Sequence, residues 1–202
     1  MNKRLFVLSG LIAVLALLVA PLGQSAAPDV GAAADAQPVS QAGPGSGLKL
    51  GGGQTSLVSI ASDGTQGNYD SGLSSVSADG RYVAFTSGAS NLVAGDTNGL
   101  FDVFVHDRDS GQTSRVSVAS DGAEGNGVSD WPSISADGRY VAFQSLASNL
   151  VGDDTNGYLD VFIHDRDSGQ TSRVSVAWDG DEGNGDSWEP SISADGRYVA
   201  FH

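Results

Sequence analysis

Ser-Ala-Asp-Gly-Arg-Tyr-Val-Ala-Phe stands at residues 77–85, and the same nine residues return at 135–143 and at 193–201. The interval is 58 residues each time. Residues 54–111 and 112–169 align without a gap and are identical at 41 of 58 positions. A fixed period of this size is typical of an array of supersecondary units, so the repeat decides the fold class.

Each repeat carries four strand signals separated by turns. In the second copy, β-branched, aromatic and alternating residues indicate strands at 132–135, 139–144, 160–166 and 171–176. The Ala-Asp-Gly at 136–138 indicates a tight turn, because glycine adopts positive φ without strain. Apolar residues occupy both faces of the middle strands, so each sheet must be covered twice. We predict an all-β fold, a β-propeller with one four-stranded blade per repeat. A β-solenoid is the alternative, but it would use parallel strands, which the hairpin turns disfavour.

The repeated nonapeptide resembles the strand–turn–strand signature of TolB-like propellers, which are also described as WD40-like or PD40-type β-propeller repeats. The resemblance covers residues 54–202. It implies a secreted or periplasmic location and a binding role. Members of this family differ widely in function, and a fold alone does not define an activity.

The predicted propeller is incomplete. We expect full blades at 73–118 and 131–176, a partial blade at 189–202 and a stray strand at 54–60. Closed propellers typically have about 4 to 8 blades. We therefore expect the chain to be a fragment of a longer protein or, as the alternative, to associate with further copies of itself through open blade edges.

The N-terminal residues predict export. A basic start is followed by an apolar run at 5–20 and then by small residues, which is typical of a signal peptide at 1–27. The run is shorter than the roughly 20 residues of a membrane span, so an uncleaved anchor is the less favoured alternative. Residues 28–53 are rich in Ala, Gly, Pro and Ser and predict a disordered linker. The expected location is secreted, periplasmic or cell-surface, without membrane insertion after cleavage.

The charge of the chain is strongly acidic. The formal net charge is −14, and removal of Lys3 and Arg4 with the leader would leave 8 basic residues against 24 acidic ones, a net charge of −16. Nucleic acids and anionic membranes attract clusters of Lys and Arg, so this balance argues against both as partners.

The loop between the second and third strands concentrates oxygen side chains. It reads Gly-Asp-Thr-Asn-Gly-Leu-Phe-Asp at 95–102 and Asp-Asp-Thr-Asn-Gly-Tyr-Leu-Asp at 153–160. A Ca²⁺ ion takes carboxylate, amide and carbonyl oxygens, which such a turn can supply. The alternative is that Asp and Asn cap the turn by bonding their own backbone. The candidate Ca²⁺ ligands are Asp96, Asn98, Asp102, Asp154, Asn156 and Asp160.

Three tryptophans do not follow the repeat and are candidate ligand-binding residues. Trp131 stands where the first copy has Leu73, and Trp178 and Trp188 lie in the link that leads into the partial blade. Aromatic side chains beside polar loops could stack on a sugar or anchor a peptide. Packing at a blade edge is the alternative.

No catalytic signature is present: the sequence has no Gly-x-Ser-x-Gly elbow, no His-Glu-x-x-His motif and no cysteine. The recurring His106 and His164 predict structural hydrogen bonds, and the arginines after each Ala-Asp-Gly turn predict local ion pairs with the turn aspartate. We expect an exported, non-enzymatic module that binds a protein or a glycan. The alternatives are the propeller portion of a larger secreted hydrolase, similar to prolyl oligopeptidases, and a purely structural surface array.

Overall fold

The computed structural model describes residues 55–202 as an all-β fold built of antiparallel sheets. The expected signal peptide at 1–27 and linker at 28–53 lie outside the described residues. Within 55–202 no helix is long and apolar enough to cross a membrane.

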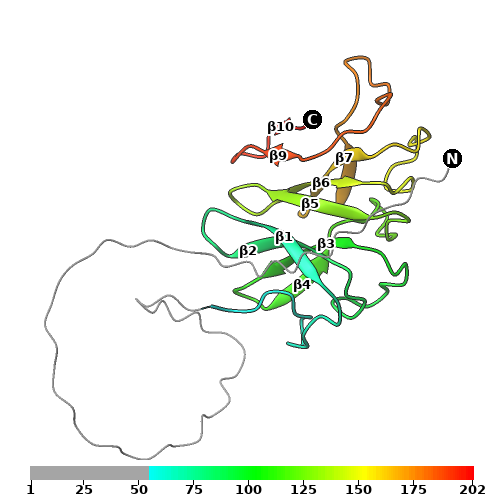
Figure 1. Cartoon of the computed structure of the whole chain (residues 1–202). Coiled ribbons are helices and arrows are strands. Elements are labelled where there is room, and N and C mark those ends of the chain that lie inside the picture. Colours follow the sequence, from blue (N-terminus) through cyan, green and yellow to red (C-terminus); the bar gives the residue numbers. More distant parts are fainter. Residues whose placement is uncertain (1–54) are drawn as a thin grey trace, which may run out of the picture.

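Two four-stranded sheets and one two-stranded sheet follow one another along the chain (Figure 1). The order within each four-stranded sheet is sequential and every neighbour is antiparallel. We call these sheets the first and second blades, and the two-stranded sheet the third unit. The first blade contains β1 (Ser71–Val76), β2 (Tyr82–Ser87), β3 (Asp102–Asp107) and β4 (Gln112–Arg115). The second contains β5 (Ser129–Ile134), β6 (Tyr140–Ser145), β7 (Asp160–Asp165) and β8 (Gln170–Arg173), and the third unit contains β9 (Ser191–Ile192) and β10 (Val199–Ala200).

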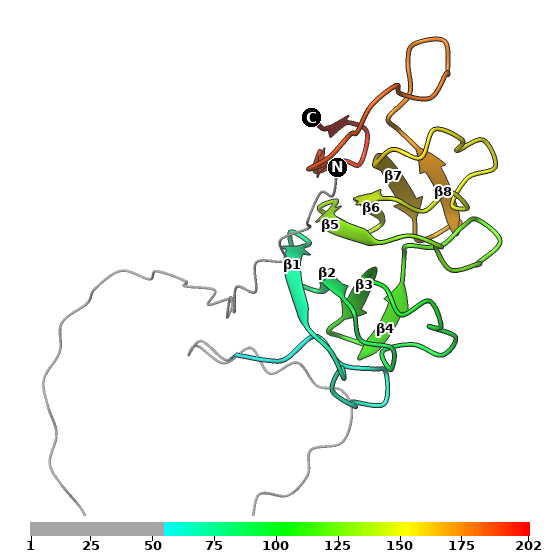
Figure 2. The ribbon, with the colours of Figure 1, turned by 45° about the vertical axis from the view of Figure 1, so that its right-hand side comes forward.

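This arrangement confirms the prediction of an incomplete β-propeller with two full blades. The inner strands β1, β5 and β9 lie along one side of the stack, and the outer strands β4 and β8 lie along the other (Figure 2). The sheets form an open arc rather than a closed ring.

A continuous apolar core joins the first and second blades. The first blade contributes Ala84, Val103, Val105 and Val116, and the second contributes a set that includes Ile134, Val141, Phe143 and Phe162. The middle strand β3 is buried at all six positions, because one of its faces packs on the second blade and the other carries a smaller cluster around Phe85 and Phe104. The prediction that both faces of the middle strands need cover is therefore confirmed.

The predicted stray strand at 54–60 is wrong for the residues described. Residues 55–59 form no strand, and only Ile60 makes a bridge, to Gln66. A β-strand needs a neighbouring backbone along its length, and here the chain bends back on itself after one bridge. The predicted strand at 171–176 also ends early, at Arg173, because the Ser175 hydroxyl takes over bonding to the Val161 N–H.

The arginine of the repeated nonapeptide does not pair with the turn aspartate as predicted. Asp79 accepts bonds from the Ser77 hydroxyl and the Arg81 N–H, which closes the β1–β2 turn. The Arg81 guanidinium instead forms a bidentate pair with Asp107 on β3, at 2.8 and 2.7 Å. Arg139 pairs in the same way with Asp165. Only Arg197 keeps the local aspartate, Asp195, at 3.7 Å.

Candidate functional site

The two rims of the array differ. The turns β1–β2 and β5–β6 are tight and lie on the left in Figure 1, while the loops β2–β3, β6–β7 and the links between blades are long and lie on the right. The long-loop rim, defined as residues 88–101, 116–128, 146–159 and 174–190, carries every candidate Ca²⁺ ligand except Asp102 and Asp160, which begin β3 and β7 beside it.

The acidic side chains of the first long loop surround an arginine. The Arg115 guanidinium nitrogen Nη1 lies 2.8 Å from Glu124, 3.3 Å from Asp102 and 3.7 Å from Asp96. The Arg115 side chain is only 8% exposed, and the Asp96 and Asp102 side chains are 3% and 0% exposed. Three carboxylates from the loop, from β3 and from the link to the second blade therefore share one buried cation.

Further hydrogen bonds fix this cluster. Asp102 accepts a bond from the Ser117 hydroxyl at 2.6 Å, and Glu124 accepts bonds from the Thr97 backbone N–H and hydroxyl. The Asn98 amide nitrogen donates to the Gly125 carbonyl at 2.9 Å. These contacts tie the β2–β3 loop to the link between the blades, in addition to the apolar packing of Ala89 and Leu92 from the same loop.

The second blade repeats the cluster around Arg173. Its Nη1 lies 3.0 Å from Glu182, 3.6 Å from Asp160 and 3.7 Å from Asp154. Asn156 donates to the Gly183 carbonyl at 2.9 Å, as Asn98 does to Gly125. The sequence analysis did not identify either arginine as a partner of the acidic loop. Each arginine is the last residue of the fourth strand of its blade, and its side chain lies on the same side as that loop.

The electrostatics of the cluster follow from burial. Desolvation raises the pKa of Asp102 and of Asp96, and for Asp96 the neighbouring Asp102 charge raises it further, while Arg115 opposes the shift in both. Glu124 differs because its bonds from Thr97 favour the ionised form and lower its pKa. One arginine thus balances three carboxylates, of which two are held in poorly hydrated positions.

An arginine occupies the position among the predicted Ca²⁺ ligands at which the sequence predicted the ion. The position between the carboxylates is filled by a guanidinium, and Asn98 turns its amide nitrogen, a donor, toward Asp102. No group of three or more His, Asp or Glu side chains with metal-site geometry is present within residues 55–202. The candidate ligands are brought together, as predicted, but around an arginine.

The three tryptophans are exposed and do not form one cluster. Trp131 on β5 is 42% exposed, Trp188 just before β9 is 45% exposed, and Trp178 in the long loop after β8 is 97% exposed. The aromatic pairs formed by the described residues involve tyrosine and phenylalanine, not tryptophan. Trp131 and Trp188 lie beside the inner strands of adjacent units, whereas Trp178 stands apart at the rim.

The inner strands carry backbone strain at one repeat position. Leu73, Trp131 and Glu189 have φ of 44°, 52° and 52°, values that side chains with a Cβ seldom adopt. A bulge accompanies the strain in β1 and β5, where the register shifts between Gly72 and Ser75 and at the equivalent place in β5. Trp131 stands within the bulge of β5, between the paired residues Asp130 and Ser133.

A half-buried carboxyl lies next to these residues. Asp130 sits opposite Gln144 in the β5–β6 pairing, and desolvation raises its pKa while the Gln144 amide opposes the shift. The Gln144 oxygen accepts a bond from the Glu189 N–H at 2.8 Å, which links the second blade to the third unit. The inner strands thus hold a polar group beside Trp131.

The recurring histidines make the hydrogen bonds predicted for them. His106 Nδ1 lies 2.8 Å from the Thr113 hydroxyl, and His164 lies 2.8 Å from Thr171. Both rings are buried, and desolvation lowers their pKa. Each threonine hydroxyl also donates to a backbone carbonyl of the preceding link, so the histidines hold strands and links together.

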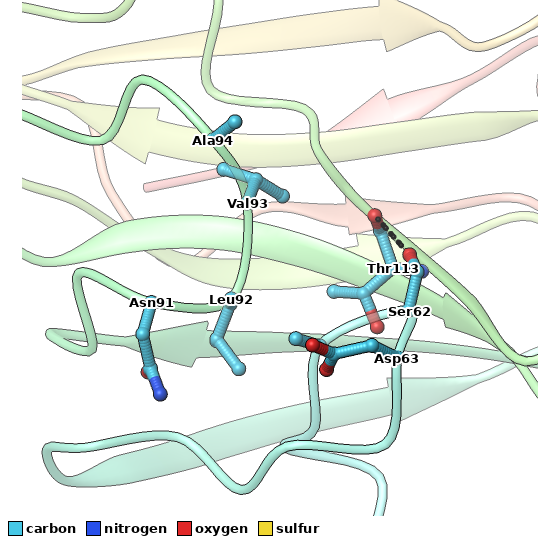
Figure 3. A pocket seen from close by; sticks show the side chains of 8 residues that line it. Ser62, Asp63, Asn91, Leu92, Val93, Ala94 and Thr113 are labelled. Carbon is cyan, nitrogen blue, oxygen red and sulfur yellow. Dashed lines mark hydrogen bonds between the residues drawn. The ribbon is translucent and has the colours of Figure 1, made fainter.

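A shallow hollow of about 450 Å³ lies on the first blade between the β2–β3 loop and the segment before β1 (Figure 3). Its lining includes Ser62, Asp63, Asn91 and Thr113. Ser62 is bonded to the Thr113 backbone, Asp63 accepts from Thr65, and Asn91 donates to Gln66. These polar groups therefore serve the backbone of the chain itself.

No protein-family model and no curated protein matches the chain. Solved structures similar to it include TolB of Agrobacterium tumefaciens, at TM-score 0.45 and 22% identity over 66% of this chain and 38% of that chain. TolB of Acinetobacter baumannii gives 0.35 and 17% over 66% and 37%. A prolyl endopeptidase gives 0.41 and 23% over 65% and 18%, and the tricorn protease gives 0.40 and 14% over 68% and 11%.

The chain spans less than two fifths of either TolB chain and a smaller share of the two peptidases. All four TM-scores lie below 0.5, so the propeller assignment rests on the strand order and blade packing of this chain itself.

Proposed function

We infer that this chain is an exported, non-enzymatic β-propeller module that binds a protein or a glycan beside its inner strands. The observation that supports this proposal is the exposure of Trp131 and Trp188, at 42% and 45%, next to the strained backbone of the inner strands. Tryptophan is enriched at binding hot spots because it offers a large apolar face and one polar N–H. Strained backbone also clusters at ligand sites, where the surrounding fold must hold it.

The rim clusters support the same proposal. Arg115 and Arg173 bind the long loops to the links, so the loops that flank the inner strands are ordered before any ligand arrives. A surface that is already ordered loses less conformational entropy on binding. The non-enzymatic part of the proposal is supported by His106 and His164, whose rings are engaged in buried structural bonds.

The test is a binding screen with defined probes, namely an array of bacterial cell-wall oligosaccharides and an array of short peptides. We expect one class to bind, and we expect Trp131→Ala and Trp188→Ala each to weaken that binding about tenfold or more. Trp178→Ala is the matched control, because Trp178 has the same side chain and is 97% exposed in the long loop after β8, apart from Trp131 and Trp188. Equal binding by the control and by the Trp131 and Trp188 variants would exclude the proposed surface. Turnover of fluorogenic peptides or glycosides by the chain would exclude the non-enzymatic assignment.

Stabilisation by Ca²⁺ stays a prediction from the sequence. Its test is thermal unfolding with and without Ca²⁺ for the wild type, Asp96→Asn and Asp154→Asn. A rise in Tm that both substitutions remove would support calcium as the counter-ion of the long loops. An unchanged Tm would mean that Arg115 and Arg173 are the counter-ions of the long loops. Their distances to the carboxylates favour this outcome.

A further inference from the structure

The contact between successive units is repeated, bond for bond, at an interval of 58 residues. Between the first and second blades, the Ala78 N–H donates to the Ala136 carbonyl at 3.0 Å, and the Ile134 N–H donates to the Ser75 hydroxyl at 3.2 Å. Between the second blade and the third unit, Ala136 donates to Ala194 at 3.0 Å. The Ile192 N–H donates to the Ser133 hydroxyl at 3.1 Å. The same groups therefore make the joint each time.

A tyrosine and a glycine complete each joint at the tight-turn rim, defined as the β1–β2, β5–β6 and β9–β10 turns at 77–81, 135–139 and 193–198. The Tyr82 ring lies so close to Gly138 that a Cβ on that glycine would be 2.1 Å from the ring. Tyr140 covers Gly196 in the same way, at 2.3 Å. Across the first joint, the Arg166 guanidinium also lies 4.4 Å from the centre of the Tyr82 ring, a cation–π contact.

The two ends of the array present the two halves of this joint. The third unit presents the Tyr198 ring, 63% exposed, together with the exposed Ala194 and Ser191. The first blade presents Val76, 59% exposed, and the exposed Ala78. Gly80, also on the first blade, has only the Arg108 side chain near its Cβ position. Ile134, the counterpart of Val76 inside the array, is only 7% exposed, so the difference comes from the neighbour and not from the residue type.

We propose that the third unit of one chain docks on the first blade of a second copy of this chain, through the joint that already links its own blades. Tyr198 covers Gly80 of the second copy, and Arg108 of that copy stacks on Tyr198 as Arg166 does on Tyr82. The Ala194 N–H donates to the Ala78 carbonyl, and the Val76 N–H donates to the Ser191 hydroxyl. This inference goes beyond the proposed ligand binding, because it uses the blade faces and the tight-turn rim.

The contact is head-to-tail, because one end carries the tyrosine half and the other end carries the glycine half. A head-to-tail contact forms a ring when the rotation between copies closes and a chain when it does not. The third unit offers two strands rather than four, so the contact covers only the inner half of the first blade. We therefore expect association that depends on concentration, and that is best measured near physiological salt because the net charge of −14 makes copies repel at low salt.

Cysteine cross-linking tests the pairing directly, because the chain contains no cysteine. Ser191→Cys and Val76→Cys, mixed and treated with a short bis-maleimide, should give cross-linked dimers, whereas neither variant alone should. The matched control is the double variant Ser133→Cys/Ile192→Cys, whose two positions form the same pair within one chain. The proposal is wrong if the control links and the mixture does not. It is also wrong if Ser191→Cys alone links as well as the mixture, since that would mean a symmetric contact.

Sedimentation of the unmodified chain is a second, independent test, because it measures how the size of the species depends on concentration. The wild type should shift from monomer to larger species as its concentration rises, and Tyr198→Ser should weaken this association about tenfold or more. Tyr158→Ser is the control, because Tyr158 is 43% exposed on the long-loop rim and outside the joint. A wild type that stays monomeric at all concentrations, or a Tyr198→Ser variant that associates like the control, would overturn the proposal.

Discussion

The second blade has two neighbours of different size. Comparing its two interfaces shows how far the burial of equivalent side chains depends on the neighbouring unit. Toward the first blade it meets four strands, and there Val105 and Val116 are each 1% exposed. Toward the third unit it meets two strands, and the equivalent Ile163 and Val174 stay partly exposed. The residues at the two interfaces are nearly the same, so the burial of this face follows the size of the unit beside it. The opposite face of the first blade differs, because Phe85 and Phe104 are buried there by Ala89 and Leu92 of their own blade.

The largest effect expected from this comparison is at the repeated phenylalanine. Phe143 lies in the core between the blades and is 0% exposed, whereas Phe201 stands at the same repeat position in the third unit and is 40% exposed. Phe143→Ala should lower the free energy of unfolding by about 3–5 kcal/mol, because it removes a fully buried ring and leaves a cavity. Phe201→Ala should cost less than half as much. Urea denaturation measures both, and equal losses would mean that the third unit is as well covered as the second blade.

At the long-loop rim we expect a loss of stability that does not depend on the neighbouring unit. Arg115→Met should cost about 3 kcal/mol at neutral pH, because it leaves the buried Asp102 and its partners without a counter-ion. Arg173→Met should cost the same, since each cluster lies within one blade and its following link. Urea denaturation of the two variants checks this equality. If Arg173→Met were much milder, the rim would share the dependence on neighbours seen at the blade faces.

The sequence predicted the fold better than the candidate site because the two depend on different information. Turn glycines and alternating apolar residues are local signals, and they located β2, β6, β3 and β7 to within a residue or two. The partner of each carboxylate is set by how a long loop folds back over its sheet. Arg115 stands 19 residues from Asp96 in the chain, so the spacing Asp-x-Asn-x-x-x-Asp could suggest a cation but not which one. The pairing of Arg81 with Asp107 was missed for the same reason.

The next effect is smaller and compares two glycines of the tight-turn rim, one covered by a neighbouring unit and one open. Gly138 and Gly80 have φ of 75° and 74°, so alanine should cost each about 1–2 kcal/mol in backbone strain. Gly138→Ala should cost about 1–3 kcal/mol more, because its Cβ would meet the Tyr82 ring across the joint. Urea denaturation of dilute protein measures the difference. If the first blade is covered by a second copy at high concentration, Gly80→Ala should also weaken that association, although it leaves the other joints unchanged.

The smallest expected effect is a pair of opposite pH dependences within the first blade. Arg81 lowers the pKa of Asp107 below its ordinary value of 3.8, so the stability from this pair is present above that pH and is lost as the pH falls through the lower, folded value. The Tm difference between the wild type and Asp107→Asn should therefore be largest near neutral pH and should shrink in acid.

Asp96 has a raised pKa, so the effect of its ionisation on stability has the other sign. Its ionisation costs stability as the pH rises above 3.8, and Asp96→Asn should gain Tm relative to the wild type over that range. Thermal unfolding between about pH 3 and pH 7 measures both variants. Curves of the same sign would mean that Arg115 neutralises Asp96 as fully as Arg81 neutralises Asp107, and that the two rims do not differ in charge balance.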